Sequence, residues 1–126
     1  MKPNPAVWFE IYVQDMMRAR KFYEAVLGVR LEKLGDPNDA TLEMMSFPMD
    51  TDRPGASGAL AKMSGFPSGG NSTLVYFGCA DCADEASRVA SSGGRIQREK
   101  MAIGEYGFIV LAIDTEGNMF GLHSTK

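Results

Sequence analysis

The start of the chain changes from one hydrophobic period to another. Residues 7–13 form an apolar and aromatic run that only Glu10 interrupts. The apolar residues that follow have helical spacing: Met16, Ala19, Phe22, Tyr23, Val26 and Leu27. This pattern predicts a strand and then an amphipathic helix. Asp15 suits the N-cap, because its carboxylate can accept amide hydrogens of the first turn, and Gly28 suits the C-terminal stop, which favours a positive φ.

The second half of the chain repeats this pattern at a constant offset. Residues 73–79 form a strand run that leads to Asp81, a second N-cap candidate. A weaker apolar stripe at helical spacing follows and ends at two glycines: Ala83, Ala86, Val89 and Ala90, then Gly93 and Gly94. Asp81 lies 66 positions after Asp15, and Gly94 lies 66 positions after Gly28. The shared offset indicates an internal duplication.

Each half predicts a strand, a helix and three further strands. The further strands are predicted at 29–34, 41–47 and 57–63 in the first half and at 95–100, 107–113 and 118–124 in the second. A chain of 126 residues is long enough for one domain and too short for two independent cores. We therefore predict one α+β domain with tandem βαβββ units at about 5–64 and 72–126. The linker 65–71 contains glycine, proline and serine, as a connector should.

Composition narrows the possible partners and compartment. The chain is 44% hydrophobic and 23% charged, and no apolar run approaches the ~20 residues of a membrane span. The first residues carry no signal-peptide pattern, which favours the cytoplasm. A net charge of -3 with dispersed basic residues disfavours nucleic acid as a partner. Cys79 and Cys82 have C-x-x-C spacing, but their positions at a strand end and a helix start favour core packing over redox or metal chemistry.

Two segments are similar to one known superfamily. Phe9-Glu10-Ile11-Tyr12-Val13-x-Asp15-x-x-Arg18-Ala19-x-x-Phe22-Tyr23-x-x-Val26-Leu27-Gly28 resembles the opening strand and helix of vicinal oxygen chelate proteins, which include glyoxalases, bleomycin resistance proteins and extradiol dioxygenases. Asp114-Thr115-Glu116-Gly117-Asn118 resembles the turn before their last strand. The resemblance implies a curved mixed sheet around a cleft, helices on the convex side, and a homodimer. It does not fix a reaction, because the fold hosts several chemistries.

The resemblance also identifies where a metal would bind. Metal-using members carry His or Glu ligands at four positions on the concave face. Three of these positions correspond to Trp8, Leu74 and Gly121, and the fourth lies in the strand 57–63, which has no His, Asp, Glu or Cys. None of the four offers a donor side chain, so we predict no metal site of the family type and no cofactor.

Glu10 and His123 are the candidate catalytic residues. Each lies two residues from a lost ligand position, so alternation along the strand places both on the concave face. As an acid and a base they suit proton transfer, and as a pair they suit weak binding of a divalent metal, which Glu43 would have to strengthen. A structural Glu–His pair is the alternative for both residues.

The other concave residues predict an organic-ligand pocket. Alternation directs Val7, Phe9, Ile11 and Val13 toward the helix and leaves an aromatic opposite face. The candidate ligand-binding residues are Trp8, Tyr12, Leu74, Tyr76, Tyr106, Met119 and Gly121. Gly121 would leave room for a ligand, and Tyr106, with Glu105, belongs either to a lid or to an ordinary turn. We predict a metal-free protein that binds a small organic molecule; the alternative is a lyase, isomerase or dioxygenase with a displaced metal site or with Glu10 and His123 as acid and base.

Overall fold

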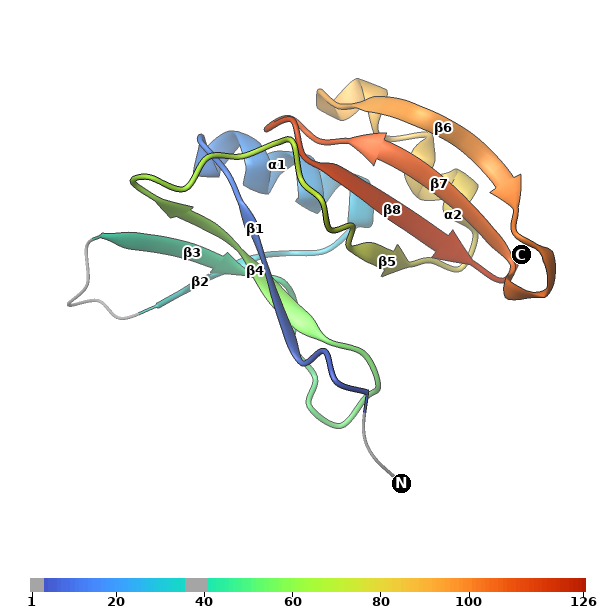
Figure 1. The fold of residues 1–126 in the computed structure, drawn as a ribbon, viewed down its shortest axis with the longest axis horizontal. Coiled ribbons are helices and arrows are strands. Elements are labelled where there is room, and N and C mark those ends of the chain that lie inside the picture. The colour runs from blue at the N-terminus through green and yellow to red at the C-terminus, as the bar shows by residue number, and fades with distance from the viewer. Residues whose placement is uncertain (1–3, 36–40) are drawn as a thin grey trace.

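The computed structural model describes residues 4–35 and 41–126, which form two four-stranded sheets (Figure 1). The first half contains β1 (Trp8–Tyr12), α1 (Met16–Leu27), β2 (Glu32–Leu34), β3 (Leu42–Ser46) and β4 (Ser57–Met63). The second half contains β5 (Tyr76–Gly78), α2 (Cys82–Ala86), β6 (Arg95–Ala102), β7 (Phe108–Ile113) and β8 (Met119–Ser124), with 3-10 helices η1 (Ala90–Ser92) and η2 (Gly104–Tyr106). No helix in these two ranges is long and apolar enough to span a membrane.

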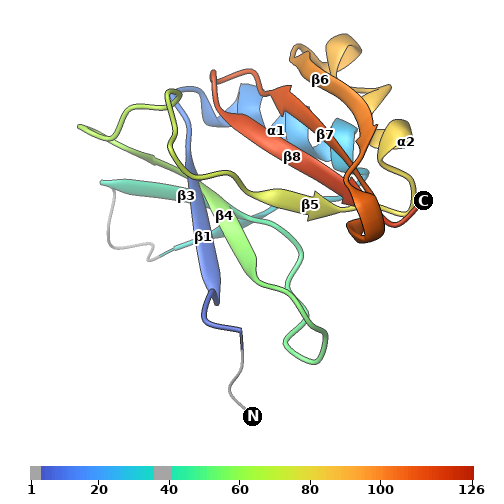
Figure 2. The ribbon, with the colours of Figure 1, turned by 45° about the vertical axis from the view of Figure 1, so that its right-hand side comes forward.

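The two sheets have the same topology. The strand order is β1-β4-β3-β2 in the first sheet and β5-β8-β7-β6 in the second. In each sheet the first and last strands of the unit pair in parallel, and the remaining pairs are antiparallel. Both helices lie on the same side of the sheets (Figure 2). The predicted α+β fold of paired βαβββ units is therefore confirmed.

Helix α1 begins and ends where the capping pattern predicts. The Asp15 carboxylate accepts a hydrogen bond from the Arg18 amide at 3.0 Å. Gly28 adopts a φ of 67°, and its amide donates to the Glu24 carbonyl. The predicted apolar stripe is buried: Met16, Ala19, Phe22, Tyr23 and Val26. The capping residues and the buried apolar stripe define the same helix, so both local hydrogen bonds and packing against the core stabilise it.

The second helix is shorter than predicted. Instead of continuing to Gly93, α2 ends at Ala86, and a turn and η1 follow. Only Cys82 within α2 is buried, so little apolar area holds a longer helix against the core. Serine hydroxyls also donate to carbonyls three residues earlier, from Ser87 to Asp84 and from Ser91 to Arg88. Such local bonds compete with a regular helix, which explains the early end.

One aromatic core joins the two units. Tyr23 of α1 contacts Phe47 after β3, Phe77 of β5 and Phe120 of β8, with ring centroids 5.4–6.0 Å apart across this cluster. Phe22 packs edge-on against Phe120 at 5.8 Å. Because these rings come from both sheets and one helix, the units share buried surface and are not independent.

Alternation along β1 separates the core from the concave face as predicted, with one exception at its start. Ile11 and Val13 are buried, and Phe9 packs against them. Trp8, 40% exposed, lies on the opposite face. Val7 does not face the core: it precedes the strand, outside the paired residues of β1, and is 77% exposed.

The β7–β8 turn of the second unit is buried against the first unit. Both oxygens of Glu116 accept hydrogen bonds: the Gln14 and Asp15 amides donate at 2.8 and 2.9 Å, and the Arg18 guanidinium at 2.7 and 3.1 Å. Burial alone would raise the pKa of Glu116, but the hydrogen bonds from Arg18 and the two amides outweigh it and hold the pKa at about 2. The turn thus fixes the junction between β1 and α1.

A second buried carboxylate in the same turn orders its backbone. Asp114 accepts from the Tyr23 hydroxyl at 2.6 Å and from the Glu116 and Asn118 amides at 2.7 and 2.9 Å. Burial raises the pKa of Asp114 and holds that of Tyr23 well above its usual range. The Asn118 side chain also donates, through its Nδ2, to the Tyr12 backbone carbonyl at 2.9 Å. The end of β1 is thereby tied directly to the start of β8.

Candidate functional site

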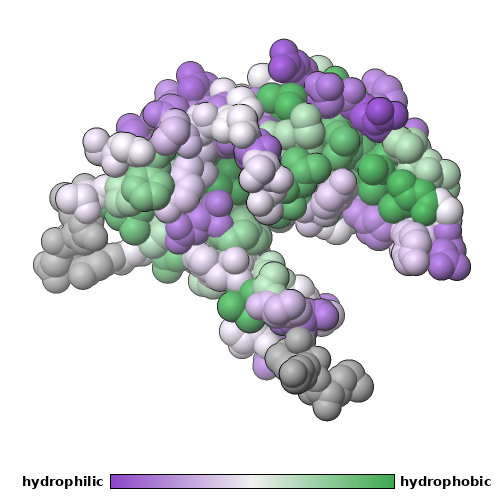
Figure 3. Space-filling view, in the orientation of Figure 1, coloured by the Kyte–Doolittle hydropathy of each residue, from purple (hydrophilic) through white to green (hydrophobic). Residues whose placement is uncertain are grey.

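A pocket of about 520 Å³ lies between β1, the segment leading to β5 and the start of β8. Its walls combine rings, small polar groups and one carboxylate: Phe9, Glu10, Ile11, Tyr12, Tyr23, Pro67, Gly69, Asn71, Ser72, Thr73, Val75, Asn118, Met119 and Phe120. A deep hollow between the two sheets is visible in the space-filling view (Figure 3). The predicted residues Glu10, Tyr12 and Met119 line the pocket itself.

Glu10 sits between two aromatic donors on its own strand. The Trp8 indole N–H donates to one carboxylate oxygen at 3.2 Å, and the Tyr12 hydroxyl donates to the other at 2.8 Å. This bond, with partial burial and the negative charge, raises the pKa of Tyr12. Alternation along the strand brings the three side chains to one face, so the sequence pattern alone predicts their proximity.

The pocket wall formed by Pro67, Gly69, Asn71 and Asn118 was not predicted as part of the site. Next to this wall, the Phe66 ring stacks on Tyr12, with centroids 5.0 Å apart and an interplanar angle of 23°. The Asn71 side chain exchanges hydrogen bonds with the backbone of Met119, both at 3.0 Å, and Asn118 accepts from the Gly69 amide at 2.6 Å. These residues fall in the predicted linker and turn, where sequence signals indicate only chain reversal. Asn71 and Asn118 were the residues in this segment and turn whose side chains could have indicated a polar part of the site.

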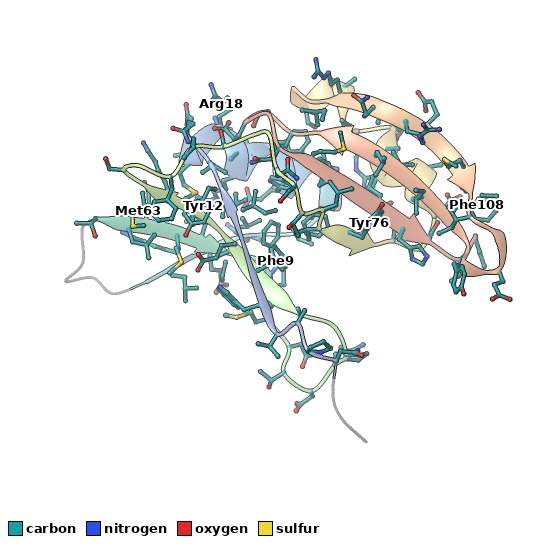
Figure 4. The ribbon with its side chains drawn as sticks, viewed as in Figure 1. Phe9, Tyr12, Arg18, Met63, Tyr76 and Phe108 are labelled. Carbon is teal, nitrogen blue, oxygen red and sulfur yellow. The ribbon has the colours of Figure 1, made fainter. Side chains whose placement is uncertain are left out.

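The corresponding region of the second sheet is filled. Tyr76 of β5, which is labelled in Figure 4, pairs with Gly121 in the parallel register of β5 and β8. A Cβ atom at Gly121 would overlap the Tyr76 ring. The room that glycine leaves is therefore occupied by Tyr76, which is 45% exposed and offers a ring surface in place of a cavity. Leu74 precedes β5 and does not line the pocket, whose wall there is Thr73 and Val75.

His123 and Glu10 are not brought together as a pair. β1 is hydrogen-bonded to β4, whereas β8 lies between β5 and β7 in the other sheet, so Glu10 and His123 do not lie on neighbouring strands. Among the described residues, no hydrogen bond or ion pair links the two side chains. His123 Nε2 lies 2.6 Å from the Tyr106 carbonyl oxygen and must carry a hydrogen, because a carbonyl only accepts. Tyr106 itself is 69% exposed.

The residues present do not fit the metal set of the family. The described part of the chain contains no cluster of three or more His, Cys, Asp or Glu side chains with metal-binding geometry. At the corresponding positions, Trp8 donates its N–H to Glu10 and Gly121 lies beneath Tyr76. In the strand register, Glu43 of β3 lies opposite Lys62 of β4, whereas Glu10 of β1 lies opposite Ala59 of β4. Glu43 therefore does not lie beside Glu10.

The cysteines have the surroundings of core residues. Cys82 is fully buried, and Cys79 packs against the same apolar cluster. Burial, with the nearby Glu85 carboxylate, raises the pKa of the Cys79 thiol to about 12. Because the thiolate is the reactive form, Cys79 is a poor nucleophile at neutral pH.

Paired βαβββ units around a pocket define the class of fold, and comparison with known families agrees. The model of the glyoxalase/bleomycin resistance protein/dioxygenase superfamily matches residues 6–122. The chain belongs to this superfamily. A search of curated proteins found no match.

Solved structures share the fold at low sequence identity. A V278E mutant of glyoxalase I from Zea mays is 23% identical with a TM-score of 0.75; the match covers 98% of this chain and 47% of that one. Glyoxalase I from Leishmania major is 20% identical with a TM-score of 0.70, over 94% of this chain and 85% of that one. A glyoxalase/bleomycin resistance protein/dioxygenase family enzyme from Burkholderia phytofirmans is 12% identical with a TM-score of 0.66, over 94% and 97%. The chain thus spans about half the length of the maize protein.

Proposed function

We propose that this protein binds a small organic molecule, without a metal ion, in the pocket between β1 and the segment leading to β5. The observation that carries the proposal is the composition of that pocket. Apolar and aromatic side chains supply most of its walls, and a few polar groups, including Glu10 and Asn71, lie among them. Binding pockets for organic ligands have this composition, because apolar area drives burial while sparse polar groups orient the ligand.

The metal-free part of the proposal rests on residue chemistry. Trp8, Leu74 and Gly121 stand where metal-using relatives carry donors, and none of them has a lone pair suited to a divalent ion. The acid–base alternative with Glu10 and His123 has less support. The two residues lie in different sheets, and both oxygens of Glu10 already accept hydrogen bonds.

Titration of the intrinsic fluorescence tests the binding function directly. Trp8 is the only tryptophan of the chain, and its N–H donates to Glu10, which lines the pocket, so its emission reports on the surroundings of that carboxylate. We expect a saturable change with at least one of three aromatic probes of different charge: benzyltrimethylammonium, benzyl alcohol and benzoate. Removal of divalent ions by dialysis against a chelator should leave the titration unchanged. Absence of saturable binding for all three probes would contradict the proposal.

Elemental analysis tests the metal-free part separately. Protein purified without an affinity tag should contain far less than one divalent ion per chain. A near-stoichiometric ion would instead support the enzyme alternative with a displaced site, and Glu10→Gln and His123→Ala would then show whether these residues hold it.

We further propose that the protein forms a homodimer through the exposed part of the second sheet. Large apolar side chains are exposed on this sheet and its adjoining loop: Tyr76, Met101 and Tyr106. Exposed apolar residues that gather on one surface are typical of protein interfaces. Sedimentation equilibrium should give twice the chain mass of 13.7 kDa, and a monomer throughout the concentration range would contradict the dimer.

A further inference from the structure

We propose that the pocket selects organic cations, with the Glu10 carboxylate as the group that pairs with the positive charge. This inference rests on the proposed binding function and names the chemical class of its ligand. An ammonium or other cationic group of the ligand would lie against Glu10, and its organic part would extend toward the apolar wall formed by Phe9, Val75 and Phe120.

The charge of the pocket carries the first step. Among the described residues that line it, Glu10 is the only acidic or basic one. Four salt bridges join described residues, and none of them includes Glu10. Its hydrogen-bond donors are the neutral Trp8 indole and Tyr12 phenol, which orient the carboxylate without neutralising it. A ligand in this pocket therefore meets one uncompensated negative charge.

The surroundings of the carboxylate carry the second step. Trp8 and Tyr12 bond to Glu10 through their ring edges, so the two rings flank the carboxylate. Phe66 stacks on Tyr12 and extends the aromatic surface. A cation near an aromatic face is stabilised by the electron-rich ring, most strongly by tryptophan. The carboxylate attracts a cation through its charge and repels an anion, and the organic part of a bulky cation can also contact the face of a flanking ring.

The local geometry orients the Glu10 carboxylate and leaves only small side chains beside it on the neighbouring strand. Both oxygens of Glu10 accept hydrogen bonds, from the Trp8 indole and the Tyr12 hydroxyl, and these bonds fix the orientation of the carboxylate. The neighbouring strand offers only small side chains next to it, since Glu10 pairs with Ala59 and Tyr12 with Ala61. Among the described residues, no lysine or arginine forms an ion pair with the Glu10 carboxylate, and only alanine side chains lie opposite it and Tyr12 on β4.

The test compares probes of nearly equal shape and different charge. Trp8 fluorescence is titrated with choline and with its neutral isostere 3,3-dimethylbutan-1-ol, at an ionic strength held constant with sodium chloride. Choline should bind about tenfold more tightly than the alcohol, from the combined charge and ring interactions. Equal affinity for the two probes would overturn the inference.

Two variants of equal charge locate the effect. Glu10→Gln removes the carboxylate and should abolish the tenfold preference, whereas Glu32→Gln removes the same charge from β2, outside the pocket lining, and should retain it. Retention of the preference in Glu10→Gln would also overturn the inference. If benzyl alcohol or benzoate binds while choline has no advantage, the cation class fails and the binding function stands. If no aromatic probe binds, the binding function itself fails.

Discussion

The two units place different chemistry at equivalent positions. Glu10 of β1 and Tyr76 of β5 are 66 residues apart, the offset of the duplication, and each faces a small residue of the parallel neighbour, Ala59 or Gly121. In the first unit the position carries a charge held by two aromatic donors. In the second, the Tyr76 ring covers the glycine. The two units therefore share their backbone arrangement at these positions, whereas the side chains there have different chemistry.

The connection between the last two strands also differs between the two units. Glu116 lies in the short β7–β8 turn, and the residue 66 positions earlier is Asp50, in the longer connection 47–56 between β3 and β4. The Glu116 side chain is fully buried, while that of Asp50 is 54% exposed and bonds to nearby Arg53. The second unit thus supplies a structural carboxylate to the first, and no such contact is returned from Asp50 among the described residues.

The largest predicted effect is a difference in the free energy of unfolding between substitutions in these two connections. Glu116→Ala leaves the Gln14 and Asp15 amides without their acceptor and removes the partner of Arg18. Loss of these bonds should lower the free energy of unfolding by about 3 kcal/mol. Asp50→Ala, the matched control, should lower it by about 0.5 kcal/mol or less, because its ion pair is exposed. Urea denaturation measures both, and similar losses would contradict the asymmetry between the turns.

The stability of the protein should depend on acid through Glu116. Its pKa lies at about 2, below the ordinary 4.5, so its contribution is complete above pH 4.5 and is lost as the pH falls toward 2. The shift corresponds to at most about 3 kcal/mol. The difference in unfolding free energy between the wild type and Glu116→Gln should shrink by that amount over this range. The raised pKa of Asp114 acts in the opposite direction but is common to both proteins. A constant difference would show that Glu116 is not the titrating group.

A smaller effect is expected where Tyr76 covers Gly121. A methyl group at this glycine overlaps the ring, so Gly121→Ala should cost about 2 kcal/mol of stability. In a Tyr76→Ala background the same change should cost much less, since the overlapping ring is gone. A double-mutant cycle in thermal denaturation measures the coupling. Additive effects would mean that the ring does not fill this space.

The smallest predicted effect concerns Tyr12 in the first unit. Its pKa is raised chiefly by the hydrogen bond to Glu10. Glu10→Gln removes the negative acceptor, so the pKa of Tyr12 should fall back toward its ordinary value of 10.0. Ultraviolet titration of tyrosine ionisation, with Tyr12→Phe to assign the group, measures the change. An unchanged titration curve would contradict the bond.

Periodicity predicted the parts of the fold that local chemistry controls. The caps at Asp15 and Gly28 and the strand Ser57–Met63 have the predicted bounds, because capping groups and alternation act within a few residues. The helix after Asp81 ended early, because its weak apolar stripe has little core to cover. The burial of the turn from Asp114 to Asn118 against α1 depends on packing between units, which no local pattern encodes.

The candidate site shows the same division. The grouping of Trp8, Glu10 and Tyr12 follows from alternation along one strand. The separation of Glu10 from His123 and the filling of Gly121 by Tyr76 depend on strand order and side-chain direction, and these are fixed only when both sheets have formed. Phe66 stacks on Tyr12 from the linker, a segment that has neither strand nor helical periodicity, so no sequence pattern predicts this contact.

The central claim is that the pocket between β1 and the segment leading to β5 holds the ligand, while the second sheet is closed where Tyr76 covers Gly121. Mapping of amide chemical shifts by nuclear magnetic resonance, during titration with benzyltrimethylammonium, tests this claim most directly. We predict that the largest shifts fall on residues 8–12 and on the pocket wall within residues 67–73, with small shifts along β7. Largest shifts around Tyr76 and His123, with none on β1, would contradict the account.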